Sequence, residues 1–134
     1  MAPGADGKAK MGSIQNPAVF LVTQRASLAL FVAGQVYGVA VEEMRKPTRG
    51  RPQVARARQI AIHLARSVFG LSQGQLAAEF RRDRSTVHHA CHLIGRMRAE
   101  NAEFNSTLDW MECLLRRAAG MSPGSGAGGL GGEY

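Results

Sequence analysis

The side chains with the clearest chemical potential lie between residues 82 and 92, in the sequence RDRSTVHHACH. Guanidinium groups bind phosphates and guanine edges in a forked geometry, and hydroxyl and imidazole groups add further hydrogen bonds. Asp83 has the residue type of a helix N-cap, and the first turn after it would display Arg84, Ser85 and Thr86 to solvent. Such a turn, on a helix whose opposite face is packed, suits insertion into the major groove of DNA.

Metal binding and catalysis are weaker interpretations of the same segment. His88 and His92 have the i, i+4 spacing of a chelating pair, but no third ligand shares their face. Cys91 falls in an apolar stripe and is expected to be a small buried hydrophobe rather than a nucleophile. His63 is expected to be a half-exposed helix residue, and the sequence has no phosphate-binding loop of the Gly-x-x-x-x-Gly-Lys-Ser/Thr type. We therefore expect a protein that is not an enzyme and that uses no metal or cofactor.

Two helices joined by a tight basic turn are predicted between Leu71 and Arg98. Ser72 is an N-cap candidate for the first helix, which would bury Leu76, Ala77 and Phe80 on one face. The second helix has an apolar stripe with helical spacing, made of Val87, Ala90, Cys91, Ile94 and Met97. The opposite face is polar and consists of Ser85, His88, His89, His92 and Arg96. This arrangement is typical of a helix-turn-helix.

Three motifs occur in the chain in a specific order: VARARQ at residues 54–59, LS at the opening of the next helix, and RDRSTVHHAC at residues 82–91. With this order and spacing, residues 54–94 resemble the C-terminal DNA-binding domain (domain IV) of DnaA, the bacterial chromosomal replication initiator. Weaker similarity extends from about residue 25 to about residue 115. The resemblance implies an all-α domain of five to six helices over residues 16–119, with a helix-turn-helix core and a Trp-repressor-like fold.

The resemblance also implies which residues contact DNA. Positions used against the DNA backbone hold Arg58, Gln59, Arg66, Arg82, Thr86 and His89. Positions that face base edges hold Asp83, Arg84 and Ser85, and Gln73 and Gly74 at the start of the preceding helix complete the predicted set. The chain departs from the family in two places, because its turn after Phe80 is one residue shorter and lacks glycine, and because Arg84 replaces a histidine. The predicted contacts to phosphates are therefore better preserved than those to bases.

The segment from Arg45 to Pro52 contains two prolines and four basic residues, so it is predicted to be a loop. It is either a solvated connector or an arm that enters the minor groove, where arginine is favoured. The family resemblance implies an arginine in this arm at the position of Gly50, so Arg49 or Arg51 would have to serve.

The distribution of charge along the chain supports a polyanionic partner. Twelve of the 17 Lys and Arg residues lie between Arg45 and Arg98, with only two of the ten acidic residues.

The most apolar stretch is ASLALFVAGQVYGVAV, residues 26–41, in a helix expected to start at Asn16-Pro17 and end near Tyr37. Glycine and glutamine interrupt it, and it is shorter than the roughly 18 to 20 residues that span a bilayer. We expect a core helix and no membrane role, although an apolar face that binds a partner helix stays open. A helix from Pro52 to Phe69 and a last helix from Asn101 to Ala118 complete the domain, with Trp110 near the edge of the latter.

Flexible tails are predicted for residues 1–15 and for the Gly-rich residues 120–134. The two cysteines have no metal-site or disulfide spacing, which favours a reducing cytosol and, with DNA binding, the nucleoid. The leading hypothesis is a stand-alone protein that binds double-stranded DNA and regulates chromosome replication initiation or transcription. The alternative is a protein–protein adaptor that uses the same fold to engage the replication initiator or its regulators. The sequence predicts no oligomeric state.

Overall fold

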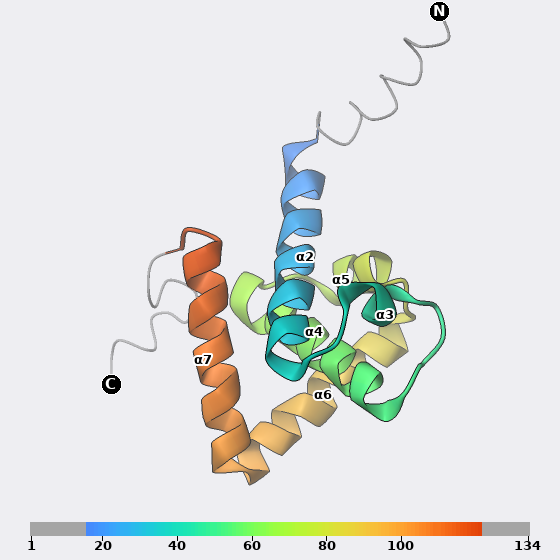
Figure 1. Ribbon diagram of the computed structural model, residues 1–134. Helices are drawn as coiled ribbons and strands as arrows, with labels where there is room; N and C mark the ends of the chain where they lie inside the picture. Colours follow the sequence, from blue (N-terminus) through green and yellow to red (C-terminus); the bar gives the residue numbers. More distant parts are fainter. Residues whose placement is uncertain (1–15, 122–134) are drawn as a thin grey trace, which may run out of the picture.

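The computed structural model describes residues 16–121, and all regular structure within that range is helical (Figure 1). It contains the six helices α2 (Pro17–Tyr37), α3 (Val41–Arg45), α4 (Pro52–Phe69), α5 (Gln73–Phe80), α6 (Arg84–Glu100) and α7 (Ala102–Ala118). The predicted all-α class and helix number are confirmed. The tail predicted at residues 1–15, and all but the first two residues of the tail predicted at 120–134, lie outside the described residues.

Most helix ends follow local signals in the sequence. The Asn16 side chain accepts a hydrogen bond from the Val19 amide, and Ser72 and Gln75 form a reciprocal capping box at the start of α5. Gly70 ends α4 in the left-handed conformation, with φ of 67°. Asp83 occupies the N-cap position of α6 as predicted, but within residues 16–121 its carboxylate accepts no backbone hydrogen bond. That carboxylate therefore stands free at the start of the helix.

Helix α4 forms the centre of the domain and contacts each of the other five described helices. Its inward face, Ala57, Ile60, Ala61, Leu64 and Val68, is fully buried as predicted. From α6 and α7 the most buried side chains are Val87, Ala90, Ile94, Leu108, Met111 and Leu115. Cys91 and Met97 flank this core and are half-buried, and burial raises the pKa of the Cys91 thiol. The apolar back of α6 is thus anchored on α4, leaving its polar face outward.

Helix α2 behaves differently along its length. Its second half is a core helix as predicted, with Ala26, Ala29, Leu30 and Ala33 buried. Its first half leaves Val19, Phe20 and Leu21 exposed. Contrary to the expectation from residues 26–41, length does not exclude a membrane crossing, because α2 begins at Pro17 and has 21 residues. Within residues 16–121 it alone is long and apolar enough for such a crossing, a property that core helices of globular proteins share.

Arg98 on α6 joins three helices through a polar network. Its guanidinium donates to Glu112 at 2.8 Å and to Asn105 at 2.7 Å on α7, and lies 3.1 Å from the His63 ring on α4. Ser67 donates to the same Glu112 carboxylate at 2.7 Å. Burial raises the pKa of Glu112, but hydrogen bonds from Arg98 and Ser67 outweigh it and the net pKa is lowered. Burial, and then the nearby Arg98 charge, lower the pKa of the His63 ring.

The turn between α5 and α6 places a non-glycine residue in a conformation that favours glycine. Arg81 has φ of 55°, and among residues 16–121 no other non-glycine residue has positive φ. The amide of Arg82 closes the turn by donating to the Ala77 carbonyl at 3.0 Å. The chain thus makes a left-handed turn without the glycine that the family resemblance implies, and Arg81 carries the strain.

Replacing Arg81 with glycine is expected to raise the free energy of unfolding by about 1 kcal/mol. Relief of left-handed strain is worth roughly 1 to 3 kcal/mol, and the added freedom of the unfolded chain removes about 0.5 to 1 kcal/mol of it. Denaturant titration measures the change. Gly70 is the matched control, because it is also left-handed and a Cβ there meets nothing within 4 Å. Gly70→Ala should therefore destabilise by a similar amount, and a destabilising Arg81→Gly would show that Arg81 is unstrained.

Candidate nucleic-acid interface

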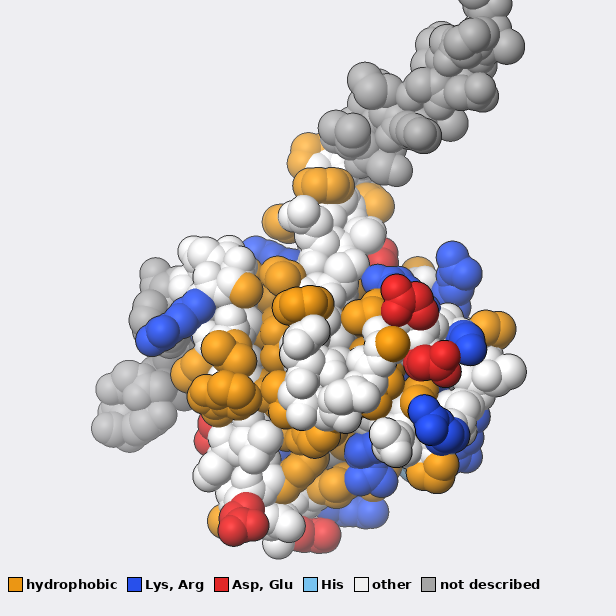
Figure 2. All heavy atoms as spheres, in the orientation of Figure 1, with side chains coloured by type: hydrophobic (Ala, Val, Ile, Leu, Met, Phe, Trp, Pro, Cys, Tyr) orange, Lys and Arg blue, Asp and Glu red, His pale blue; other side chains and the backbone are white. Residues whose placement is uncertain are grey.

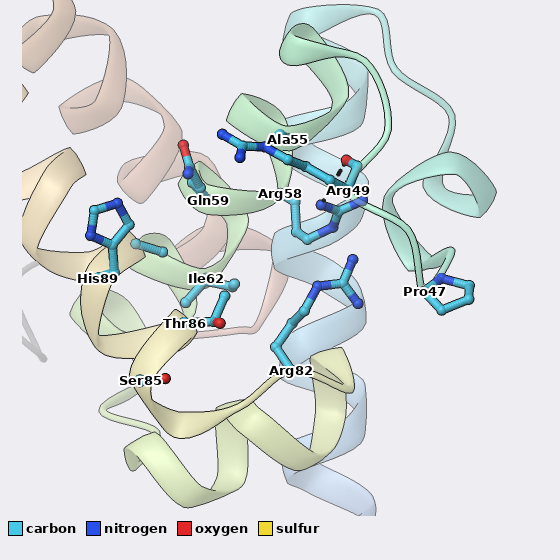
Figure 3. Close-up of a pocket in the computed structure, with 11 residues that line it drawn as sticks. Pro47, Arg49, Ala55, Arg58, Gln59, Ile62, Arg82, Ser85, Thr86 and His89 are labelled. Carbon is cyan, nitrogen blue, oxygen red and sulfur yellow. Dashed lines mark hydrogen bonds between the residues drawn. The ribbon is translucent and has the colours of Figure 1, made fainter.

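A cleft of about 530 Å³ opens where the loop before α4, the first turns of α4 and the start of α6 meet (Figure 3). Seven of the side chains predicted to bind DNA line it: Arg49, Arg58, Gln59, Arg82, Ser85, Thr86 and His89. Pro47, Ala55, Ile62 and Ala90 complete its walls. Residues up to 43 positions apart in the sequence are therefore brought to one concave, positively charged surface.

Arg58 is the buried member of this set, with 5% of its surface exposed. Its guanidinium donates to the Met44 carbonyl at 2.7 Å, to the Arg49 carbonyl at 3.2 Å and to the Thr48 carbonyl at 3.4 Å. Burial, and secondarily the charge of Arg82, lower the pKa of Arg58. In this structure the side chain predicted to touch DNA holds the loop instead.

Arg82 holds the same loop from the other side. Its Nη2 donates to the Lys46 carbonyl at 2.8 Å and to the Thr48 carbonyl at 3.4 Å, while Nη1 donates to the Phe80 and Arg81 carbonyls in the turn before α6. Thr48 thus accepts from both arginines. The loop is exposed, yet it is fixed to α4 and to the helix-turn-helix, unlike a connector held only by its ends. We call this pair, Arg58 and Arg82, the loop clamp.

The remaining cleft side chains have donors free to meet a ligand. Arg49, Ser85, Thr86 and His89 are exposed, and Gln59 is half-buried. Figure 3 shows the Arg49 side chain extending from the loop toward Gln59, while Thr86 and His89 project from α6. The Gln59 amide oxygen accepts from Arg56 at 3.2 Å, and the Gln59 NH₂ group makes no hydrogen bond within residues 16–121. A phosphate at the cleft mouth would meet donors from all three segments.

A second group of predicted residues lies beside the cleft, at the start of α5. Arg84 packs over Gly74, where a Cβ would come within 2.9 Å of the guanidinium Nη2. The Gln73 amide lies 3.1 Å from the His88 ring. Glycine at position 74 therefore leaves the room that the Arg84 side chain occupies. Asp83 is exposed at the start of α6, beside Arg84.

Two predicted residues lie outside both groups. Arg51 precedes α4 and is exposed, but it does not line the cleft. Arg66 is at the opposite end of α4, where it donates to the Leu71 carbonyl at 2.8 Å and so braces the α4–α5 turn. The sequence did not predict that Met44, Lys46 and Thr48 accept hydrogen bonds from the two arginines of the loop clamp. They do so through backbone carbonyls, which every residue type has, so the sequence carries no signal for them.

Residues 30–94 match the family model described as the bacterial DnaA protein helix-turn-helix. The chromosomal replication initiator protein DnaA of Methylibium petroleiphilum is 34% identical over 105 residues, which cover 78% of this chain and 21% of that protein. DnaA of Mycobacteroides abscessus is 33% identical over 92 residues, covering 69% of this chain and 18% of that protein.

The chain therefore spans about a fifth of the length of the curated relatives it matches. The matched region includes the last turns of α2, the loop clamp and the first turn of α6. The resemblance drawn from the sequence motifs is confirmed by the family match. Through residues 30–94, the chain belongs to the family of DnaA C-terminal helix-turn-helix domains.

Proposed function

We propose that this chain binds double-stranded DNA through the cleft and regulates the initiation of chromosome replication or transcription. The observation that carries the proposal is the convergence of loop, α4 and α6 on one cleft lined by cationic and hydrogen-bonding side chains. α6 enters the major groove with its first turn, while Gln59, Thr86 and His89 contact phosphates. The site of action is the nucleoid in the cytoplasm.

Arg49 supplies the minor-groove contact in this proposal, and the loop clamp positions it. Arg49 lines the cleft, whereas Arg51 does not, and this difference supports Arg49 over Arg51 for the role. Arg58 acts on DNA indirectly, because three of its hydrogen bonds hold the Met44–Arg49 backbone. A narrow minor groove attracts arginine through its enhanced negative potential.

A second candidate function, the protein–protein adaptor, is favoured by a different observation. Phe31 on α2 and Trp110 on α7 are each 54% exposed, and both border an apolar hollow that shares no lining residue with the cleft. Exposed apolar patches of this kind mark interaction surfaces. Under this alternative the partner is the replication initiator or one of its regulators, and DNA contact is secondary.

DNA binding should show a steep salt dependence. Because each phosphate contact releases counterions, log K should fall against log salt with a slope of roughly −0.9 per contact. Arg49→Ala should weaken binding and reduce the preference for A·T-rich flanks, whereas Arg51→Ala, the matched control two residues away, should change binding less. Fluorescence anisotropy on a short duplex over a series of salt concentrations measures both effects.

Undetectable binding at low salt, or a slope near zero, would contradict DNA binding and leave the adaptor function. A larger loss from Arg51→Ala than from Arg49→Ala would instead show that the arm approaches DNA differently from the cleft geometry. The adaptor function instead predicts a protein complex that does not depend on DNA. A complex captured from cells would survive nuclease treatment and be lost when Trp110 is replaced with glutamate.

A further inference from the structure

Helix α2 presents a regular stripe to solvent on the side opposite the core. The stripe consists of Phe20, Gln24, Ser27 and Phe31, whose spacing of four, three and four residues keeps them on one face of a helix. Phe20 is 45% exposed and Phe31 is 54% exposed, whereas between them Gln24 is exposed and Ser27 is half-buried. Two aromatic rings thus face water at either end of the stripe, with two small or flexible polar residues between them.

A hollow of about 610 Å³ runs beside this stripe, between α2 and the second half of α7. Its walls are nearly all apolar and include Leu28, Phe31, Trp110 and Leu114. Figure 2 shows hydrophobic side chains gathered on this face, over α2 and the neighbouring α7, and again at the exposed start of α2. A groove between two helices is the natural seat for a third.

We propose that a second copy of this chain covers the face, through antiparallel pairing of α2 with α2 of the partner subunit. The stripe is symmetric about the point between Arg25 and Ala26. Antiparallel pairing about that point sets Phe20 against Phe31 of the partner subunit, and Gln24 against Ser27 of the partner subunit. Each Phe20 then enters the hollow beside Leu114 and Trp110, so the exposed half of α2 fills the groove of the other copy. A two-fold axis makes both contacts identical.

Charges along one edge of the stripe are also complementary under this pairing. Glu79 accepts a hydrogen bond from Thr23 at 2.9 Å, so its carboxylate lies beside α2 near residue 23. Arg45 donates to Ser27 at 3.1 Å, so its guanidinium lies beside α2 near residue 27. These two levels lie on opposite sides of the symmetry point, and both are within three residues of it. Pairing therefore brings Glu79 of one copy next to Arg45 of the partner subunit, twice per dimer.

The pairing leaves the DNA-binding cleft open. The cleft is lined by residues of the loop, of α4 and of the start of α6, and by no residue of α2. Resting on the proposed function, a dimer of this kind carries two separate DNA surfaces and holds two duplex segments at once. A monomer would hold only one.

Analytical ultracentrifugation of the full chain over a range of concentrations tests the pairing. The wild type should approach twice the mass of the chain, and Phe31→Glu should remain a monomer with unchanged helical circular dichroism. Val19→Glu is the matched control, because Val19 is 49% exposed on the same helix but lies off the stripe, and it should still form the dimer. Binding of a single short duplex should be the same for all three proteins, so a failure of pairing is distinguishable from a failure of DNA binding.

The register is tested by cysteine cross-linking in a Cys113→Ser background, since Cys113 is exposed. A mixture of Gln24→Cys and Ser27→Cys proteins should give a cross-linked heterodimer faster than either protein alone gives a homodimer. A wild type that stays monomeric at about 100 µM overturns the proposal. A dimer that persists in the Phe31→Glu variant also overturns the proposal. The same holds if the apolar face binds phosphatidylglycerol vesicles and no second copy of the chain.

Discussion

Replacing Arg98 with methionine is expected to lower the free energy of unfolding by about 2 to 3 kcal/mol, because the partly buried Glu112 carboxylate loses charge-assisted hydrogen bonds that water only partly replaces. The side chains of Arg98 and Glu112 are only 15% and 13% exposed. Methionine retains the aliphatic volume but leaves the Glu112 carboxylate without its main hydrogen-bond donor. Because α4, α6 and α7 all meet at this network, the whole domain should unfold earlier, as measured by urea titration.

Arg96 provides the control for this experiment. It is exposed on the opposite side of the same helix and makes no side-chain hydrogen bond within residues 16–121. Arg96→Met removes the same charge from the same helix, yet it should change stability by less than about 0.5 kcal/mol. Equal effects from the two variants would mean that Arg98 contributes only helix propensity and net charge. The two arginines contribute equally to the net charge of the sequence, and only their positions in the fold predict different effects on stability.

Local signals explain why the helix ends were predictable. Asn16-Pro17, Pro52 and Gly70 each set backbone geometry through their own residue chemistry, so boundaries at these positions required no knowledge of the rest of the chain. Periodicity likewise placed Leu108, Met111 and Leu115 in the core. The start of α2 was harder to interpret. Its first turns are apolar but extend past the body of the domain, and no local pattern shows what lies beside a helix.

The sequence predicted several of the residues that gather at the cleft, but it did not predict which groups each side chain contacts. The family resemblance brought thirteen residues together, and the structure places seven of them around one cleft. It could not show that Arg58 and Arg82 donate to loop carbonyls, because both acceptors belong to backbone that is distant in sequence. Nor could it show that Arg81 takes up the left-handed turn, since arginine rarely adopts that conformation. Long-range backbone contacts and strained residues are set by the whole fold.

Changing Arg84 to histidine is expected to alter the DNA sequence that the protein selects. In the family pattern a histidine at this position faces a base edge, and the longer arginine fork contacts guanine O6 and N7, which is worth about 1 to 3 kcal/mol of discrimination. The Arg84 guanidinium lies over Gly74 at the start of α5, beside the exposed first turn of α6. Selection from a random duplex library should therefore return a guanine at one or two positions for the wild type. The same positions should shift for Arg84→His.

Thr86→Val is the better control for this experiment than a change at Arg82. Thr86 is exposed on the same turn and is expected to contact a phosphate, so losing its hydroxyl should weaken all sequences about equally. Arg82 also holds the loop through the Lys46 carbonyl, so its replacement would disturb two segments together. An unchanged motif after Arg84→His would contradict base recognition by this side chain. The short turn at Arg81 would then be the cause to examine, because a turn with one residue fewer rotates the first turn of α6 relative to the groove.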